Sequence, residues 1–285
     1  MLEILHNFVP QPIAFQLGFI TIHWYGLFVV GGMVAALLVA SKLAGKLGIA
    51  RDDVWDLAFY VVIFGLLGAR TYAVLLELPY YLAHPDQIIA IWNGGIAIHG
   101  ALIGGALAVV YFARKKNVSA WLYADLLAVV IPLGQAIGRW GNYFNQELFG
   151  KPTDAAWGIP IDALHRPAAY SNVTHFHPTF LYESVLNLVN FGVLLFLFRR
   201  AYSTNHETGN TKQETGIMKH GKGLIFVYLI NYALIRIAME LVRIDRTPAL
   251  FGIRVPILVS VGILVLGIVG LWWKQQFDTR KLNHV

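Results

Sequence analysis

The sequence predicts an all-α, polytopic integral membrane protein with about seven transmembrane helices. Of its 285 residues, 57% are hydrophobic and 13% are charged, whereas a soluble domain carries about 25% charged residues. Apolar runs of about 20 residues, long enough to cross a bilayer as helices, recur along the chain. The basic residues are distributed unevenly between successive loops. Together these observations favour a single membrane domain over residues 1–285.

Seven apolar runs are predicted to span the membrane: residues 20–40, 54–76, 94–113, 121–138, 179–198, 223–242 and 255–273. The residues before the first run have neither a basic region nor a continuous apolar core, so no cleavable signal peptide is expected. Residues 143–178 are too polar and too interrupted by proline and glycine to span, and are expected to form an extracytoplasmic loop region. Residues 201–222 are polar and aperiodic, and are predicted to be a flexible cytoplasmic linker.

The orientation follows from the lysines and arginines. The first 41 residues contain none, and most of the others follow the first, third, fifth and seventh runs. Because cytoplasmic loops carry the excess of basic residues, the N-terminus is predicted to lie outside and the C-terminus in the cytoplasm. Eight basic residues depart from this pattern and fall in outer loops or outer halves of spans: Arg70, Arg139, Lys151, Arg166, Arg236, Arg243, Arg246 and Arg254. Topology alone would not retain them there.

Costly polar residues gather at one depth. With these spans, Arg70 lies about 24 Å and Arg236 about 20 Å from the inner ends of their helices. His99 falls near the outer end of the third span, and Arg139 at the outer end of the fourth, as its cap. Polar groups inside a membrane are expensive and often mark functional sites. We therefore expect a site in the outer leaflet.

Each of these residues also has a structural interpretation. Arg236 and Glu240 can form an i,i+4 ion pair that serves packing, and Arg139 can extend to the interface from a span end. His99 can be a neutral core histidine bonded to a carbonyl. Arg70 can pair with Glu77 or Glu183 and join helices, Tyr25 and Tyr182 can belong to the interfacial aromatic belt, and Asn142 and Asn145 can cap the fourth helix. The convergence of so many such residues at one depth favours function.

Arginines open to the outer leaflet suit an anionic lipid headgroup, because the guanidinium fork binds phosphate through two parallel hydrogen bonds. Histidine adds a group that can accept a proton near neutral pH. The chain has no cysteine, so any thiol in the reaction comes from a partner, and a cysteine-based metal site is excluded. These residues point to phospholipid chemistry without naming a reaction.

Several motifs occur in order: His23-Trp24-Tyr25-Gly26, Gly68-Ala69-Arg70, residues 92–100 (WNGGIAIHG), residues 138–150 (GRWGNYFNQELFG), residues 177–183 (HPTFLYE), and the set Tyr232, Arg236, Glu240 and Arg243. Together they resemble the motifs of the prolipoprotein diacylglyceryl transferases over nearly the whole chain. Two mild departures are Ala101, where a second glycine is expected, and Tyr143, where phenylalanine is usual. We call residues 138–150 the signature segment.

The resemblance implies a multi-pass enzyme of the bacterial inner (plasma) membrane that uses no cofactor or metal. Such enzymes move the diacylglyceryl group of phosphatidylglycerol to the lipobox cysteine of prolipoprotein signal peptides and release glycerol phosphate. The thiol proton must leave, since a thiol has a pKa of about 8.5, and fixed cations must stabilise the departing phosphate.

The resemblance also implies roles for individual residues. His99 would accept the thiol proton, although a phosphate held by arginine is an alternative acceptor. Arg139 and Arg236 would bind the phosphate. Glu147 and Glu240 would orient these arginines. Nine residues complete the predicted substrate site. Asn142, Tyr25 and Tyr232 would position the lipid, and the others are Arg70, Asn145, Gly150, Tyr182, Glu183 and Arg243.

Two other classes of membrane protein compete with this interpretation. A lipid transporter or flippase needs polar residues through both leaflets, whereas the inner halves of these spans are nearly free of charge. A lipid-binding scaffold without transferase activity remains an alternative. A retinal receptor is excluded, because the seventh run has no lysine before Lys274.

Overall fold

A computed structural model describes residues 2–202 and 221–282. Most of them are helical, and five helices are long and apolar enough to cross a membrane: Trp24–Leu47, Arg51–Leu76, Ala120–Phe144, Thr179–Ala201 and Val255–Gln276. The chain is therefore a polytopic membrane protein. Most of the predicted linker at 201–222 lies outside the described residues.

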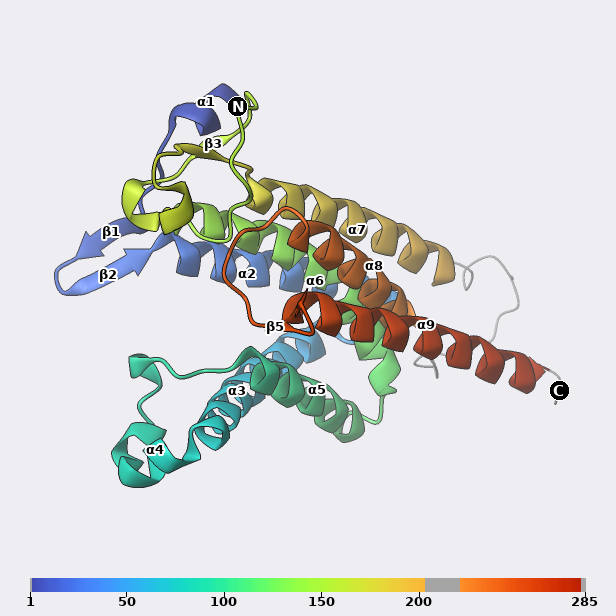
Figure 1. Cartoon of the computed structure of the whole chain (residues 1–285). Helices are drawn as coiled ribbons and strands as arrows, with labels where there is room; N and C mark the ends of the chain where they lie inside the picture. Colours follow the sequence, from blue (N-terminus) through green and yellow to red (C-terminus); the bar gives the residue numbers. More distant parts are fainter. Residues whose placement is uncertain (1, 203–220, 283–285) are drawn as a thin grey trace. The chain divides into compact units, whose positions relative to one another are not determined.

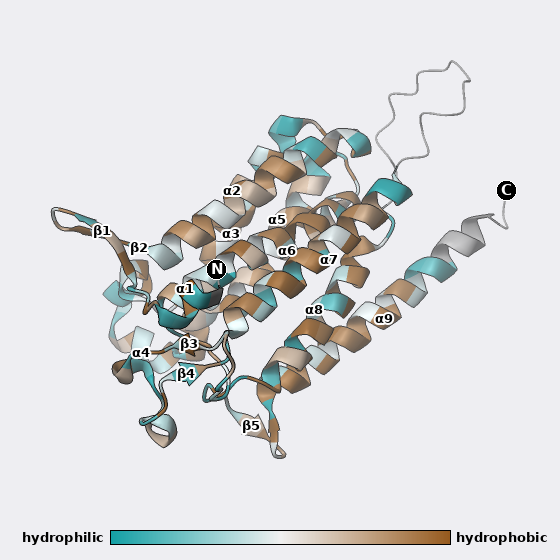
Figure 2. Ribbon diagram, turned by 90° about the horizontal axis from the view of Figure 1, so that it is seen from above, coloured by the Kyte–Doolittle hydropathy of each residue, from teal (hydrophilic) through white to brown (hydrophobic). Residues whose placement is uncertain are grey.

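The helices follow the predicted runs closely. They are α2 (Trp24–Ala44), α3 (Arg51–Leu76), α5 (Ile98–Lys115), α6 (Ala120–Phe144), α7 (Thr179–Ala201), α8 (Leu224–Glu240) and α9 (Val255–Leu282). α5 and α8 match two predicted spans but are not among the five, and the 17 residues of α8 extend only about 26 Å. Figure 2 shows mainly hydrophobic colouring along the long helices.

Several boundaries differ from the prediction. α5 begins at Ile98 and not at residue 94, and α9 continues to Leu282 beyond residue 273. Residues 20–23 do not begin the first helix, because Ile20–His23 forms strand β2, which pairs antiparallel with β1 (Ile13–Leu17). The alternation Ile-Thr-Ile is typical of a strand, although the same residues also fit the start of an apolar run. In addition, α6 continues to Phe144, so Arg139 lies inside the helix and does not cap it.

Close contacts divide the chain into two compact units: Met1–Ala36 with Leu127–Ala201 and Gly223–Val285, and Leu37–Leu126 with Tyr202–Lys222. In the first unit α8 packs along both α7 and α9 (Figure 1). Two glycines of α9, Gly267 and Gly270, lie against Phe226 and Ile230 of α8. Many side chains of α9 are exposed, including Leu266 at 66%, as expected of a surface that faces lipid.

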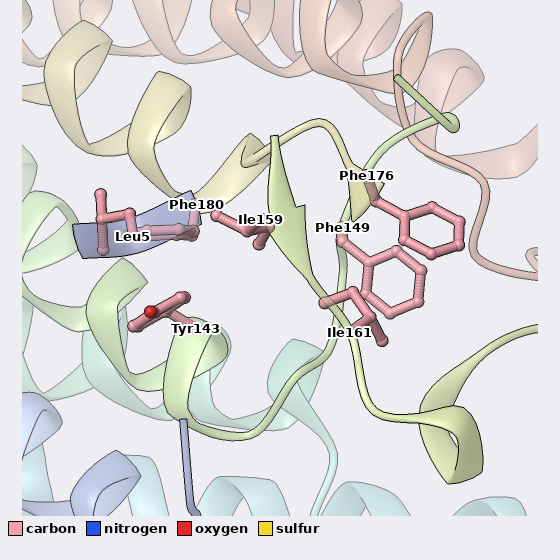
Figure 3. Packing of buried hydrophobic residues seen from close by; sticks show 7 residues of the cluster. All are labelled: Leu5, Tyr143, Phe149, Ile159, Ile161, Phe176 and Phe180. Atoms are coloured by element: carbon pink, nitrogen blue, oxygen red, sulfur yellow. The ribbon is translucent and has the colours of Figure 1, made fainter. Parts of the chain in front are cut away.

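The first unit has a hydrophobic core of its own around the segment between α6 and α7. The segment between α6 and α7 contains the short strands β3 (Ile159–Pro160) and β4 (His175–Phe176), which pair antiparallel, and the 3₁₀ turns Ala163–His165 and Ala168–Tyr170. The N-terminal helix α1 (Leu2–Asn7) contributes Leu5 to this core. Figure 3 shows its seven members: Leu5, Tyr143, Phe149, Ile159, Ile161, Phe176 and Phe180. Full burial of each large apolar side chain stabilises the fold by about 1.5–3 kcal/mol, so this core fixes the signature segment.

In the second unit α3 and α5 pack against each other. The contact is close because glycines face backbone atoms: a Cβ added to Gly104 would overlap the carbonyl of Phe64, and one added to Gly100 would overlap Gly68. Small residues at helix interfaces allow this approach in membranes. Helix α4 (Leu78–Ala83) and the 3₁₀ turns Pro85–Ile88 and Ile91–Asn93 connect the two helices.

We expect Gly104→Ala to destabilise this helix pair by about 1–3 kcal/mol, because the added methyl group has no space. The adjacent Gly105→Ala is the matched control, since its Cβ would meet only Val61 Cγ1, at 3.7 Å. Thermal unfolding of both variants in detergent measures the difference. Equal melting temperatures would contradict this account of the interface.

Candidate active site

The buried carboxylate of Glu183 forms the centre of the site. Glu183 lies in the first turns of α7 and is 3% exposed. Three guanidinium groups surround it: Arg139 Nε at 2.5 Å, Arg243 Nη1 at 3.6 Å and Arg236 Nη1 at 3.8 Å. These arginines come from α6, from the loop after α8, and from α8. The first unit therefore brings together four residues that the sequence predicted for one site.

Glu183 forms a hydrogen-bonding contact with only one of the three arginines. Only Arg139 lies within hydrogen-bonding distance of this carboxylate, because such bonds rarely exceed about 3.2 Å. Nη1 of Arg243 is buried and has no hydrogen-bond partner among the described residues. A buried N–H group that has no hydrogen-bond partner is costly. The cluster can therefore accept another anion.

Arg236 is held by the second carboxylate of the cluster. Glu240 follows it by one turn of α8 and pairs with its Nη2. The other Glu240 oxygen lies 3.1 Å from Nε of Arg254, the residue just before α9. The ion pair expected from the i,i+4 spacing is thus present, but it forms part of a chain of charges.

Arg254 and Asp245 belong to this cluster, and the predicted site omitted both. Arg254 donates hydrogen bonds to the carbonyls of Arg243, at 2.8 Å, and Asp245, at 2.9 Å. Asp245 accepts from Nε of Arg243 at 2.7 Å. Burial would raise the pKa of Asp245, but the hydrogen bond and charge of Arg243, with the charge of Arg254, hold it below its usual value. The signal that identifies Arg254 in the sequence is its departure from the positive-inside pattern.

The end of the signature segment is linked to Arg139. Nη1 of Arg139 donates to Oδ1 of Asn142 at 3.2 Å, and Nδ2 of Asn142 donates to Glu147 at 2.7 Å. Asn145 donates to the same oxygen of Glu147 at 3.4 Å. The asparagine side chains therefore do not cap α6, as one alternative proposed, but bond to Glu147.

The backbone of this segment has an unusual conformation. Gln146 and Leu148 have φ values of 51° and 57°, in the left-handed region that non-glycine residues rarely adopt. Gln146 is buried and bonds to Pro10 O at 2.9 Å and Asp162 N at 2.6 Å. Gly150 donates to His177 O at 2.9 Å and forms a bridge with Arg243. These bonds fix the segment beside the arginine cluster.

Three tyrosines predicted for the site lie in the same unit. Tyr25 packs against Gly141, where an added Cβ would lie 2.9 Å from its ring. The hydroxyl of Tyr182 bonds to Trp157 Nε1 at 2.8 Å and to His177 Nδ1 at 3.0 Å. Tyr232 lies one turn before Arg236 on α8, with its ring 6.0 Å from that of Tyr228. No direct bond to the arginine cluster is described for these three side chains.

Arg70 belongs to the second unit and organises a loop there. It is 8% exposed and donates to four backbone carbonyls, those of Ile88, Gly94, Gly95 and Gln87. Its guanidinium also lies 5.0 Å from the ring centre of Tyr81. Its described partners are thus carbonyls and not Glu77, and most of its five N–H groups are occupied.

His99 also belongs to the second unit, at the start of α5. Its side chain is exposed, and its ring lies 5.9 Å from that of Tyr72. It has no hydrogen-bond partner among the residues that the structure describes, so the alternative of a core histidine bonded to a carbonyl is not supported. No cluster of three His, Asp or Glu side chains arranged for a metal occurs in the described part of the chain.

Comparison with known proteins defines the class. Residues 12–273 match the prolipoprotein diacylglyceryl transferase family. The chain is 44% identical over 265 residues to the phosphatidylglycerol–prolipoprotein diacylglyceryl transferase of Acaryochloris marina, covering 93% of this chain and 90% of the relative. The protein of the same name from Parasynechococcus marenigrum is 43% identical over 274 residues, covering 94% and 95%. This chain therefore belongs to the prolipoprotein diacylglyceryl transferase family and is a transferase.

Proposed function

We propose that this protein transfers the diacylglyceryl group of phosphatidylglycerol to the thiol of the lipobox cysteine in prolipoproteins, the first step of lipoprotein maturation. The observation that carries the proposal is the arrangement of Arg139, Arg236 and Arg243 around Glu183, with two contacts too long for hydrogen bonds. Membership of the family and the names of the relatives support the same reaction.

The cluster suits a phosphodiester. The cluster contains four positive charges, those of Arg139, Arg236, Arg243 and Arg254. It contains three negative charges, those of Glu183, Glu240 and Asp245. The surplus of one charge matches the single charge of the lipid phosphate. Phosphate oxygens can take the N–H groups of Arg236 and Arg243 that Glu183 does not reach, while Arg139 remains held by Glu183. Arginines fixed in this way act with little reorganisation as charge develops.

The reaction forms a C–S bond and breaks a C–O bond. The sulfur attacks the glycerol carbon that bears the phosphate, and the electron pair of the C–O bond leaves with the phosphate as glycerol phosphate. The thiol proton goes to His99, or alternatively to a phosphate oxygen. The chain contains no cysteine, so the attacking sulfur comes from the prolipoprotein.

The purified protein, incubated with labelled phosphatidylglycerol and a lipobox peptide, tests this proposal. We expect the label on the peptide, with a mass increase of one diacylglyceryl group and release of one glycerol phosphate. Binding of the lipid without transfer would favour the alternative of a lipid-binding or transport protein.

We further propose seven spans in the bacterial inner (plasma) membrane, with α5 and α8 crossing it, the N-terminus outside and the C-terminus in the cytoplasm. The loops rich in lysine and arginine support this orientation. Leu164→Cys, in the segment between α6 and α7, should react with a membrane-impermeant thiol reagent from outside. Lys46→Cys, which follows α2, should react only after the membrane is opened. Reaction of both residues in intact cells would contradict the orientation.

A further inference from the structure

A cavity of about 390 Å³ lies beside the outer ends of α6 and α8. Five polar residues line it, two of them with carboxylates: Asn145, Gln146, Glu147, His165 and Asp245. Phe149 and Ile244 are among its apolar residues. We call this cavity the outer pocket. All of its residues belong to the first unit, as does the arginine cluster.

With the orientation proposed above, the segments that form the outer pocket follow the outer ends of the two helices that carry Arg139 and Arg236. α6 ends at Phe144, and the pocket begins with the next residue, Asn145. α8 ends at Glu240, and the loop that follows it supplies Ile244 and Asp245. A phospholipid held by its phosphate at Arg139 and Arg236 keeps its acyl chains in the membrane. Its headgroup is attached to the other side of the phosphate and therefore points toward this cavity.

Two short connections join the pocket to the phosphate-binding side chains. On one side, Asn142 bridges Arg139 and Glu147, with bonds of 3.2 and 2.7 Å. On the other, Asp245 accepts directly from Arg243 Nε at 2.7 Å. The pocket is thus separated from the arginines by one amide side chain on the first side and by a single ion pair on the second. A group bonded covalently to the phosphate can reach it.

The pocket offers acceptors for hydroxyl groups. Both described bonds to the Glu147 side chain use Oε1, so among the described residues Oε2 has no donor. Oδ2 of Asp245 lies 3.6 Å from Arg254 Nη2, beyond hydrogen-bonding distance. Carboxylate oxygens accept strong hydrogen bonds from hydroxyl groups. An apolar surface with a few such groups is typical of a small-ligand site.

We propose that the outer pocket binds the glycerol of the phosphatidylglycerol headgroup and, after transfer, that of the glycerol phosphate product. Glu147 and Asp245 accept hydrogen bonds from its two hydroxyl groups, His165 lies beside them, and the apolar wall contacts its carbon atoms. This inference rests on the proposed function and adds to it the recognition of a polyol headgroup.

The test compares phosphatidylglycerol with phosphatidylpropanol, which has the same phosphate and acyl chains but no headgroup hydroxyls. Wild-type protein should prefer phosphatidylglycerol by about 10- to 100-fold in kcat/KM for transfer to a lipobox peptide. With phosphatidylpropanol, the carboxylates of the pocket lose the hydrogen bonds from the headgroup hydroxyls. Glu147→Gln and His165→Ala should each reduce this preference by several-fold. Leu164→Ala is the matched control, since Leu164 neighbours His165, is 92% exposed and does not line the pocket.

Equal kcat/KM for the two lipids in the wild-type protein would overturn the inference while leaving the transferase function intact. The inference would also be overturned if Glu147→Gln and His165→Ala lowered kcat/KM equally for both lipids, which indicates a structural role. The same holds if these variants changed only the kcat/KM for the peptide. If neither lipid supports transfer, the proposed function fails. Ligand binding then tests separately whether the outer pocket recognises the glycerol group. Saturation-transfer NMR should then show stronger contact of the wild-type protein with glycerol phosphate than with propyl phosphate, and a loss of this difference in His165→Ala.

Discussion

Arg139→Lys should lower the rate of diacylglyceryl transfer by about 10²–10³-fold, the usual effect of losing one preorganised donor to the transition state. Arg139 holds Glu183 through Nε and Asn142 through Nη1 at once. Lysine keeps the charge but lacks the planar fork, so it cannot make both contacts and present a donor to phosphate. Transfer to a lipobox peptide by purified protein measures the effect.

Arg246→Lys is the control for this substitution, because Arg246 lies in the same unit and is exposed. It should transfer at nearly the wild-type rate. The Arg139→Lys protein should also insert in the membrane and melt at a similar temperature, which separates a loss of chemistry from a loss of fold. Wild-type turnover in Arg139→Lys would assign the arginine to a structural role.

His99→Gln should lower transfer by about 10²–10⁴-fold near neutral pH if His99 accepts the thiol proton, the range typical of general bases. With the wild-type protein the rate should rise with pH as the imidazole loses its proton, and then level off. The variant should lack this step. Its rate should continue to rise toward the pKa of the peptide thiol, near 8.5, because the free thiolate needs no base.

His84→Gln is the matched control in the same unit, since His84 is exposed and bonds only locally, to Tyr80 O at 3.1 Å. It should show the wild-type pH dependence. An unchanged pH–rate profile in His99→Gln would exclude His99 as the base. The proton acceptor would then be Glu147, Glu240 or the lipid phosphate.

The long helices could be predicted from the sequence because lipid demands about 20 apolar residues for each span. The ends could not, because they depend on tertiary partners. Ile20–His23 is apolar enough for a span but pairs with β1. Likewise, α6 extends through Asn142 to Phe144 because its last turn packs Tyr143 on Phe180, with ring centres 4.6 Å apart.

The candidate site was predictable where the sequence places charges inside spans, as for Arg139, Glu183 and Arg236. It was not predictable where partners come from loops. Asp245 and Arg254 join Glu240 and Arg243 only because the short hairpin of β5 (Ala249–Leu250) and β6 (Ile253–Arg254) turns the chain back toward α8. The backbone bonds of Arg70 depend in the same way on the fold of a loop about 20 residues further along the chain.

The central claim is that the arginine cluster holds the phosphate as a leaving group while sulfur attacks carbon. Phosphatidylglycerol labelled with ¹⁸O at the oxygen between the diacylglycerol carbon and phosphorus tests it directly. After incubation with protein and lipobox peptide, mass spectrometry should find all of the ¹⁸O in the released glycerol phosphate and a thioether-linked, unlabelled peptide. Recovery of the ¹⁸O in free diacylglycerol would mean that the P–O bond breaks, and would contradict the account.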